Sequence, residues 1–400
     1  MIEPAIFFNE DAWKITWHQN FNKIERRCAR CVYDDHTPGI IFDENGVCQY
    51  CKQHDQLTEQ YMVTGERRFE EIVAAIKQEG KNKKYDVIVG VSGGCDSSYT
   101  MYLAKEHGLR PLAVHFDNTW NSTIAVENIN NLLSSLNVEL YTHVVDNKEY
   151  DDLYLAILRA GVSELDIPTD LALAAVLNKA AAKYGVRYIF EGHAFSTEGV
   201  APLGWGYIDA KYVESMYKQF GSGMKLKTFP NLWLHKQLKW MLVNRLKKIR
   251  PLWYLPYNKP EVKKLLTEKF NWQWYGGHHL ENQITAFCHS YLLPRRFNMD
   301  QRKNSFSALV RSNQMTRQEA LEQLAEPPAC NMNLVEMILK RWQLSEGQFI
   351  EYMIQPIKTF RNFKTYKPTF ERWRLFFYVM AKMEFIPWSF YIKYTAKSPT

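Results

Sequence analysis

Short apolar runs alternate with helical stretches through the middle of the chain. Four runs rich in β-branched and aromatic residues are bounded by polar residues, as buried strands are: 86–91, 111–117, 139–145 and 187–191. Apolar positions three and four residues apart predict helices between them: 67–78, 122–136, 151–160 and 169–184. Strands that alternate with helices predict an α/β fold with a doubly wound parallel sheet.

The pattern also predicts how the chain is divided. We expect an N-terminal segment over 1–60, an α/β domain over 61–230, a helical segment facing substrate or partner over 231–325, and a C-terminal helical region over 326–400. Capping boxes that begin at Thr316 and Ser345 support helices in the last two parts. The aromatic-rich stretch from 370 to 394 predicts helical packing or an assembly surface.

One stretch combines an apolar helical face with strong positive charge. Residues 231–250 contain six Lys or Arg and no acid, and Leu234, Leu238 and Met241 fall on one side of a predicted helix. The favoured interpretation is a packed helix with a solvated basic face. Peripheral contact with an anionic membrane surface, or with an anionic partner, remains the alternative.

Composition limits the classes of function. The chain has 400 residues, of which 46% are apolar, so it can bury sizeable cores. A net charge of +7 suits anionic ligands but does not require nucleic acid, and we expect no nucleic-acid partner. Acidic residues within the first 19 positions argue against a secretory signal, and no apolar run reaches about 18 residues. These features predict a cytoplasmic protein.

Four of the seven cysteines have metal-ligand spacing. Cys28 and Cys31 form one C-x2-C pair, and Cys48 and Cys51 form another, with turn-forming residues in between. Four thiolates at this spacing predict a closed tetrahedral site, which is typical of structural Zn²⁺ in a zinc-ribbon-like module.

A glycine-rich loop lies where the first predicted strand turns into a helix. It contains Ser92, Gly93, Gly94, Cys95, Asp96, Ser97 and Ser98. Glycines allow close approach of the backbone, and free N–H groups at a helix start attract anions, so the loop predicts a phosphate site. Cys95 is interpreted as a small filler at a variable position of the loop, and a reactive thiol is the alternative.

Polar residues also end the other predicted strands. Asp117 ends the second strand, Asp146 the third, and Glu191 and Gly192 the fourth. Ligands bind at the carboxyl ends of strands in such sheets, so these residues predict a site for ATP and Mg²⁺. Glu191 is the expected magnesium-side carboxylate, and Asp117 the expected ribose-side or adenine-side one.

The loop resembles the PP-loop of the adenine nucleotide alpha hydrolase-like superfamily, whose sheet is HUP-like. Further motifs follow in order, and together they are similar to the N-acetyl sugar amidotransferase family of lipopolysaccharide O-antigen and surface-glycan biosynthesis. They are the two cysteine pairs and the stretches 191–205, 274–281, 290–302 and 314–320. The resemblance covers roughly residues 25–325. His278 and Gln301 stand where the family often has lysine.

The resemblance implies an ATP-dependent, AMP-forming conversion of an acetamido group of a nucleotide-activated sugar to an acetamidino group. It implies ammonia from glutaminase and cyclase-like partners, since Cys288 and Cys330 lack the Gly-x-Cys-x-Gly setting of a glutaminase nucleophile. The catalytic residues we expect are Asp96, Glu191, His278, His279 and Glu281. The substrate-binding residues we expect are Glu198, Trp205, Arg295, Arg296 and Arg302.

Alternatives accompany these hypotheses. The arginines would equally form a solvated basic surface, and the histidines would equally be packing residues. A PP-loop tRNA-thiolating enzyme also combines such a loop with cysteine pairs. Isolated Cys95, Cys288 and Cys330 argue against it, because many thiolases carry a second cysteine pair near the active site.

Overall fold

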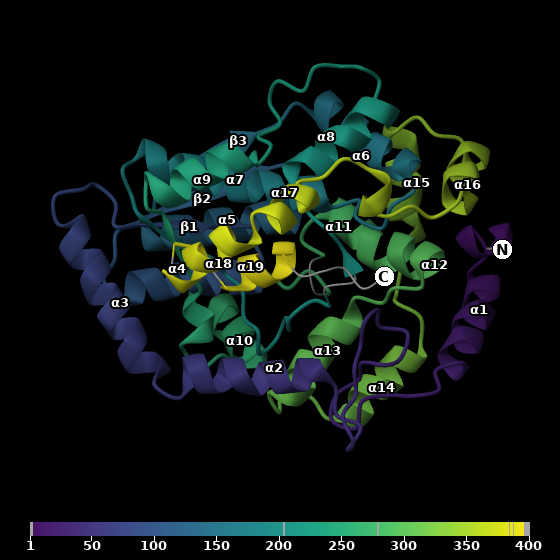
Figure 1. Cartoon of the computed structure of the whole chain (residues 1–400), viewed down its shortest axis with the longest axis horizontal. Helices are drawn as coiled ribbons and strands as arrows, with labels where there is room; N and C mark the ends of the chain where they lie inside the picture. Colours follow the sequence, from purple (N-terminus) through teal and green to yellow (C-terminus); the bar gives the residue numbers. More distant parts are fainter. Residues whose placement is uncertain (1–2, 203–204, 278–279, 384, 387, 396–400) are drawn as a thin grey trace.

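A five-stranded parallel sheet lies at the centre of the molecule, as the computed structural model shows over residues 3–202, 205–277, 280–383, 385–386 and 388–395 (Figure 1). The strand order is β3-β2-β1-β4-β5. The bounds are β1 (Val87–Gly90), β2 (Pro111–Asp117), β3 (Leu140–Val144), β4 (Tyr188–Phe190) and β5 (Lys247–Ile249). The predicted α/β class and its doubly wound parallel sheet are confirmed.

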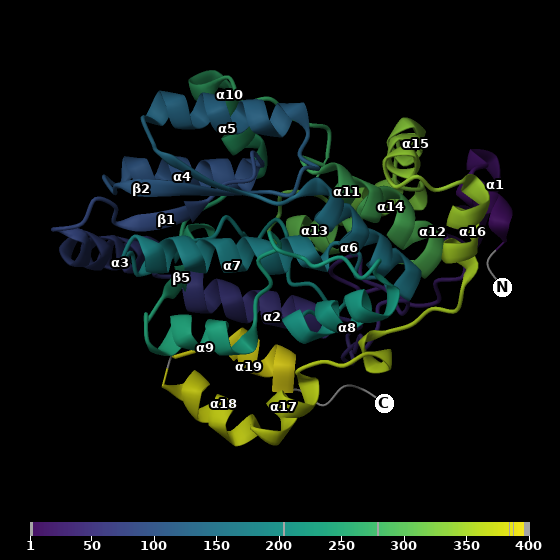
Figure 2. The same cartoon turned by 90° about the horizontal axis from the view of Figure 1, so that it is seen from above.

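The central strands are apolar on both sides because helices cover both faces of the sheet. Val87 and Val89 face one core, which α3, α4, α5 and α10 share, while Ile88 faces a second core with α6 and α7. Figure 2 shows α4, α5 and α10 on one side of the sheet and α7 on the other. Side chains alternate between the two cores because successive residues of a strand point to opposite faces.

The helices up to the end of the sheet have these bounds: α1 (Glu10–Asn22), α2 (Gln49–Leu57), α3 (Gly65–Gly80), α4 (Cys95–Glu106), α5 (Thr123–Leu136), α6 (Asn147–Ala160), α7 (Ile167–Lys183), α8 (Ala210–Phe220), α9 (Leu234–Leu242) and α10 (Lys259–Phe270). The later helices are α11 (Gln283–Phe287), α12 (Leu293–Phe297), α13 (Arg302–Arg311), α14 (Arg317–Ala325), α15 (Met332–Arg341), α16 (Glu346–Ile354), α17 (Lys367–Arg372), α18 (Arg374–Lys382) and α19 (Trp388–Thr395).

The stretch 231–250 differs from the single helix that its pattern predicts. Helix α9 ends at Leu242, and Lys247–Ile249 forms β5, which pairs with β4 in parallel. The sheet therefore extends past residue 230, the expected end of the α/β domain. Leu234, Leu238 and Met241 of α9 pack against a small core of α17, α18 and the segment after them. That packing accounts for the apolar side of the helix without a membrane.

The topology determines where a ligand can bind. The chain leaves β1 toward β2 and β3 on one side, and β4 and β5 lie on the other side. The carboxyl ends of β1 and β4 form the switch point of the sheet, where ligands bind in folds of this kind. The glycine-rich loop follows β1 and lies at this point. Among the described residues, no helix is both long and apolar enough to cross a bilayer.

Candidate functional site

The glycine-rich loop forms the tight turn between β1 and α4. Gly93 has a φ of +80°, and a β-carbon there would lie 2.2 Å from the Ala125 carbonyl oxygen of α5. Only glycine fits this close approach in this conformation. The Gly93 carbonyl accepts hydrogen bonds from Trp272 Nε1 (3.0 Å) and Asn128 Nδ2 (3.2 Å). These donors hold the carbonyl on the α5 side, so the loop is shaped before any ligand binds.

Serine side chains fold back on the same turn. Ser92 Oγ lies 3.2 Å from Ser97 Oγ and accepts from the Gly94 N–H at 3.3 Å. Ser97 Oγ donates to the Gly94 carbonyl at 3.2 Å, and the Ser98 N–H donates to the same carbonyl at 3.1 Å as α4 begins. The predicted loop residues thus gather around the first turn of α4, whose N-terminus carries a partial positive charge.

The end of β4 closes on this turn from the other side of the switch point. A β-carbon on Gly192 would lie 2.7 Å from the Ser97 Cα and N atoms. The absence of a side chain at Gly192 therefore lets the β4 end touch the start of α4. Gly192 thus lies beside the predicted loop residues, and a larger residue there would push β4 away from α4.

Asp96 is the charged group at the centre of the site, and it has two partners that the sequence did not reveal. Lys259 Nζ lies 2.8 Å from Asp96 Oδ2, and the Tyr257 hydroxyl donates to Asp96 Oδ1. Burial acts to raise the pKa of Asp96, but the Lys259 charge outweighs it and holds that pKa below its ordinary value. Burial alone would lower the pKa of Lys259, yet Asp96 and Glu198 raise it, so the ammonium stays charged.

The expected site residues did not include Lys259, although one sequence signal could have drawn attention to this residue. It is the first residue of α10, where the positive end of a helix disfavours a cation. A lysine there needs an acidic neighbour, and Asp96 is that neighbour. The neighbour itself is 163 residues away in the chain, so no local pattern could identify it.

Tyr275 and Glu281 lie against the loop. Tyr275 Oη accepts a hydrogen bond from the Cys95 N–H at 3.4 Å. A β-carbon on Gly94 would lie 2.9 Å from Glu281 Oε1, so the carboxylate is against the loop. The Glu281 carbonyl accepts from the Ser122 N–H at 2.9 Å. Glu281, one of the predicted catalytic residues, therefore lies at the loop. The other two predicted residues of this motif, His278 and His279, lie outside the described residues.

Cys95 is buried beneath the loop and 3.6 Å from the Tyr257 hydroxyl. Burial raises the pKa of its thiol to about 12, so the thiol is neutral at physiological pH. This environment agrees with a filler and not with a nucleophile.

Two carboxylates predicted at strand ends have structural partners. Glu191 forms ion pairs with Lys248 (2.5 Å) and Arg250 (3.2 Å), both contributed by β5 or the residue after it. Burial acts to raise its pKa, but the two cations hold that pKa at about 2. Asp117 Oδ1 accepts from the Thr119 N–H at 2.8 Å and from Asn121 Nδ2 at 3.0 Å, so it shapes the turn after β2. These contacts do not favour Glu191 as a magnesium ligand, because both of its carboxylate oxygens already pair with basic side chains.

Of the three arginines predicted to bind substrate, Arg295 and Arg296 are buried and Arg302 is half-buried. Arg295 donates to the Ile6 carbonyl and to Glu10, which ties α12 to the N-terminal segment. Arg296 is buried and donates to the Gln355 carbonyl at 3.3 Å, and burial lowers its pKa to about 10. Arg302 pairs with Asp300 at 2.9 Å and donates to the Glu326 carbonyl at 2.8 Å. Contacts within the protein thus engage all three side chains, but Arg295 Nε, Arg296 Nε and Arg296 Nη1 are buried with no hydrogen-bond partner among the described residues. The burial of Arg295 and Arg296 does not agree with a solvated basic surface.

Glu198 and Trp205 complete the predicted set. Glu198 Oε2 lies 3.6 Å from His193 Nε2, and its charge also acts on Lys259, so it belongs to the neighbourhood of Asp96. Trp205 is buried and packs edge-on against Tyr33, with ring centroids 6.1 Å apart. Trp205 therefore joins the core of the cysteine module.

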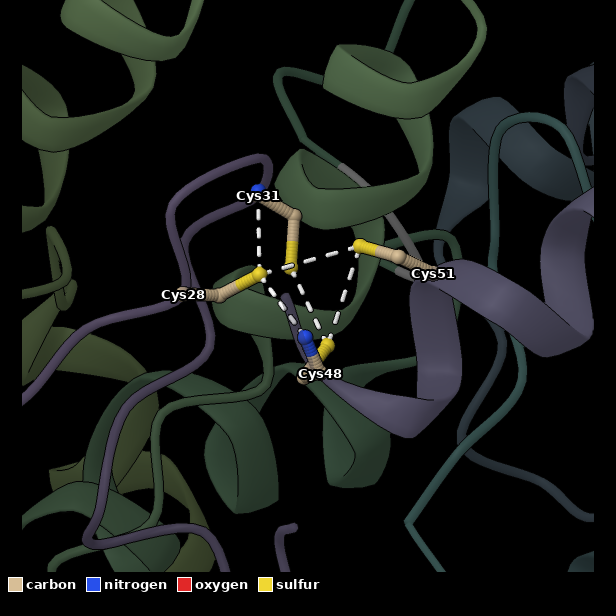
Figure 3. A group of neighbouring side chains, drawn as sticks. All are labelled: Cys28, Cys31, Cys48 and Cys51. Atoms are coloured by element: carbon tan, nitrogen blue, oxygen red, sulfur yellow. Dashed lines mark hydrogen bonds between the residues drawn. The ribbon is translucent and has the colours of Figure 1, made fainter. Parts of the chain in front are cut away.

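The four paired cysteines form one cluster, and Figure 3 shows their sulfurs facing one another. The side chains are fully buried, and the four sulfurs lie within 4.8 Å of one another. Cys28 Sγ accepts hydrogen bonds from the N–H groups of Cys31 (3.4 Å) and Cys48 (3.3 Å), as thiolate ligands do. The predicted metal site is thus supported by its ligands' geometry.

A buried arginine adds positive charge to the cluster. Arg311 of α13 donates to Cys31 Sγ at 3.2 Å and to Cys51 Sγ at 3.3 Å. Arg317 donates to the Cys28 carbonyl at 3.0 Å and to the Cys31 carbonyl at 3.1 Å. A closed site of four thiolates with a metal dication has a net negative charge, which Arg311 offsets. These contacts attach the N-terminal module to α13 and α14.

The part of the chain that contains α13 and α14 is similar to a known protein family. Residues 281–380 match the family described as "LPS biosynthesis protein WbpG-like, C-terminal domain". The predicted resemblance to enzymes of lipopolysaccharide biosynthesis is confirmed for this part. The matched part begins at Glu281, which lies against the glycine-rich loop. No curated protein matches the chain in sequence.

Solved structures give weaker similarities. The chain is 14% identical to NMN synthetase from Francisella tularensis, with a TM-score of 0.33, covering 63% of this chain and 95% of that one. It is 14% identical to the U34-tRNA thiolase NcsA from Methanococcus maripaludis, with a TM-score of 0.33, covering 79% and 89%. It is 14% identical to the NH3-dependent NAD synthetase from Campylobacter jejuni, with a TM-score of 0.31, covering 76% and 99%.

Proposed function

We propose that the protein is an ATP-dependent, AMP-forming amidotransferase of lipopolysaccharide or related glycan biosynthesis. It converts an acetamido group of a nucleotide-activated sugar to an acetamidino group. The observation that carries the proposal is the contact between Glu281 and the Gly94 turn, because it joins the WbpG-like domain to the glycine-rich loop. A glycan-pathway domain and a phosphate loop then share one site.

The loop residues are suited to hold the phosphates of ATP. The N–H groups of Gly93, Asp96 and Ser97 lie at the start of α4 beside the hydroxyls of Ser92 and Ser97, whereas those of Gly94, Cys95 and Ser98 donate to Ser92, Tyr275 and the Gly94 carbonyl. Preorganised donors of this kind stabilise negative charge that develops during phosphoryl transfer. We assign Lys259 to the same task, since it brings a buried positive charge within 2.8 Å of Asp96.

The chemistry follows from the poor reactivity of an amide. The acetamido oxygen attacks the α-phosphorus of ATP, and pyrophosphate leaves with the bonding electron pair. Ammonia then adds to the imidate carbon, loses a proton, and expels AMP together with the former acetamido oxygen. Glu281 is the described carboxylate at the loop that can take this proton. Asp96, whose two oxygens are held by Tyr257 and Lys259, orients Lys259 at the loop, and Mg²⁺ brought with ATP would offset phosphate charge when bound.

The cysteine cluster fits Zn²⁺. Tetrahedral ligands about 2.3 Å from zinc lie about 3.8 Å from one another. The observed Sγ–Sγ distances are 3.8 Å for Cys28–Cys51, 3.7 Å for Cys31–Cys48 and 3.7 Å for Cys48–Cys51. A four-iron cluster would hold the sulfurs much further apart, because each cysteine binds a different iron. We therefore propose a structural zinc ion.

Ammonia would come from a partner. Among the described residues, Cys95 and Cys288 are buried, and burial raises the pKa of both thiols, so neither serves as a glutaminase nucleophile. We propose glutaminase and cyclase-like subunits as the source, with the reaction in the cytoplasm. The same buried thiols disfavour the thiolation alternative.

The test is an incubation with ATP, Mg²⁺, ammonium salt and UDP-linked N-acetyl sugars. We expect AMP and a sugar nucleotide in which NH replaces oxygen, in equal amounts, by mass spectrometry. Formation of ADP would contradict the mechanism. Transfer of sulfur to bulk tRNA, with no change in the sugar nucleotides, would contradict the assigned substrate.

A further inference from the structure

The outward side of α18 is apolar and exposed. Trp373, Leu375 and Val379 are 56%, 77% and 45% exposed, and Phe376 and Met383 also face solvent. The inward side of the same helix is apolar too, because Phe377, Met380 and Ala381 fill a small core with Phe370. A helix that needs only its inner side for folding thus presents a second apolar side to the surroundings. Contiguous exposed apolar surface marks an interaction site.

Positive charge surrounds this apolar side. Arg372, Arg374 and Lys382 lie within or directly beside α18, and all three are exposed. Over 355–383 the chain has seven Lys or Arg and a single acid, Glu371, which lies 3.7 Å from Lys367. The combination therefore suits a partner that is anionic and also offers an apolar layer.

The position and length of the helix fit a flat surface. Helices α17, α18 and α19 form a separate layer at one edge of the molecule, joined to the body through α9 (Figure 2). At nine residues α18 is about 14 Å long, which is too short to span a bilayer but enough to lie along it. Trp373 and Tyr378 add amphipathic rings of the kind found at the headgroup level.

We propose that α18 docks the protein on the surface of an anionic phospholipid bilayer. Leu375, Phe376 and Val379 enter the headgroup region, and Arg372 and Lys382 contact lipid phosphates. A second copy of this chain is disfavoured as the occupant, because it would bring the same excess of positive charge against this side. The proposal places at α18 the membrane contact that is only the alternative for 231–250, where the apolar side of α9 is packed. It does not depend on the proposed reaction.

Flotation with lipid vesicles tests the proposal. We expect the full-length protein to float with vesicles of phosphatidylcholine and phosphatidylglycerol in equal parts, and about tenfold less with phosphatidylcholine alone. Leu375→Ser with Val379→Ser should reduce binding to the mixed vesicles by about tenfold or more, because both side chains are exposed and leave the core intact. Arg372→Glu with Lys382→Glu should do the same at low salt only.

Val63→Ser is the matched control, since Val63 is 73% exposed in the turn before α3. It should bind vesicles as the unchanged protein does. Failure of the unchanged protein to bind the mixed vesicles would overturn the proposal, as would undiminished binding by the Leu375→Ser/Val379→Ser variant. The proposal would also be overturned if the unchanged protein sediments as a dimer and the Leu375→Ser/Val379→Ser variant as a monomer. The surface would then serve self-association.

Discussion

The contact between Lys259 and Asp96 places a charged, buried lysine at the loop. Replacing Lys259 with Met should lower kcat/KM for ATP by about 100-fold, because the site loses a fixed positive charge where phosphate charge develops. AMP formation at varied ATP concentration measures this. Lys264→Met is the control, because Lys264 is exposed on the same helix.

Loss of Lys259 also leaves Asp96 without its cation, so folding needs a separate readout. Thermal unfolding should still be cooperative, because Tyr257 continues to donate to Asp96. If Lys259→Met folds and its kcat/KM for ATP is unchanged, Lys259 does not act on the phosphates of ATP.

Cys95 provides the second test at this scale. Because burial holds its thiol pKa near 12, the reaction does not use a thiolate, and Cys95→Ser should keep most AMP formation. Asp96→Ala should abolish it, since the carboxylate anchors both Tyr257 and Lys259. The same AMP assay compares the two. An inactive Cys95→Ser protein that still folds would return thiol chemistry to consideration.

At the scale of elements, the cysteine module is attached to α13 and α14 through its metal ligands. Chelation or Cys31→Ser should lower the free energy of unfolding by several kcal/mol, because zinc binding and folding are coupled at such sites. Metal analysis should find one zinc per chain, lost in Cys31→Ser and retained in Cys330→Ser. A Cys31→Ser protein with full metal content and unchanged stability would contradict the zinc assignment.

Strand β5 is held at the sheet edge by Glu191, and this pairing predicts a pH dependence. The folded pKa of about 2 lies below the ordinary 4.5, so the stabilisation is complete above pH 4.5 and is lost as pH falls toward 2. Glu191→Gln should lower stability by about 1–3 kcal/mol at neutral pH. It should also flatten the acid limb of chemical unfolding measured over this range.

Glu70→Gln is the control for that limb, because Glu70 is exposed on α3. The stability of Glu70→Gln should follow the unchanged protein at every pH. An acid limb of Glu191→Gln as steep as that of the unchanged protein would show that the ion pairs with Lys248 and Arg250 do not contribute.

The sequence predicted those elements whose signal is local. Strands β1, β2 and β4 were found because runs such as Val87–Gly90 are buried on both faces and so remain apolar. Strand β3 is exposed or half-buried, and its β-branched and aromatic residues identified it. Strand β5 was missed because it is three residues long and contains two exposed lysines, which is common at a sheet edge. The helical period of Leu234, Leu238 and Met241 therefore predicted a single helix that included the residues of β5.

At the scale of the whole molecule, the site depends on contacts between distant segments. Cys28, Cys31, Cys48 and Cys51 could be assigned because spacing alone defines such ligands. The burial of Arg295 against Glu10 could not be predicted, because a sequence does not distinguish a buried arginine from a solvated one. The same limit applies to Lys259, whose partner is contributed by another helix.

The account depends most on the claim that ATP activates the acetamido oxygen at the loop. The direct test supplies a nucleotide-linked N-acetyl sugar whose acetamido oxygen is isotopically heavy, together with ATP, Mg²⁺ and ammonium salt. The account predicts that the heavy oxygen appears in the phosphate of AMP, with one labelled AMP for each amidine formed. Amidine formed with unlabelled AMP, or with ADP in its place, would contradict it.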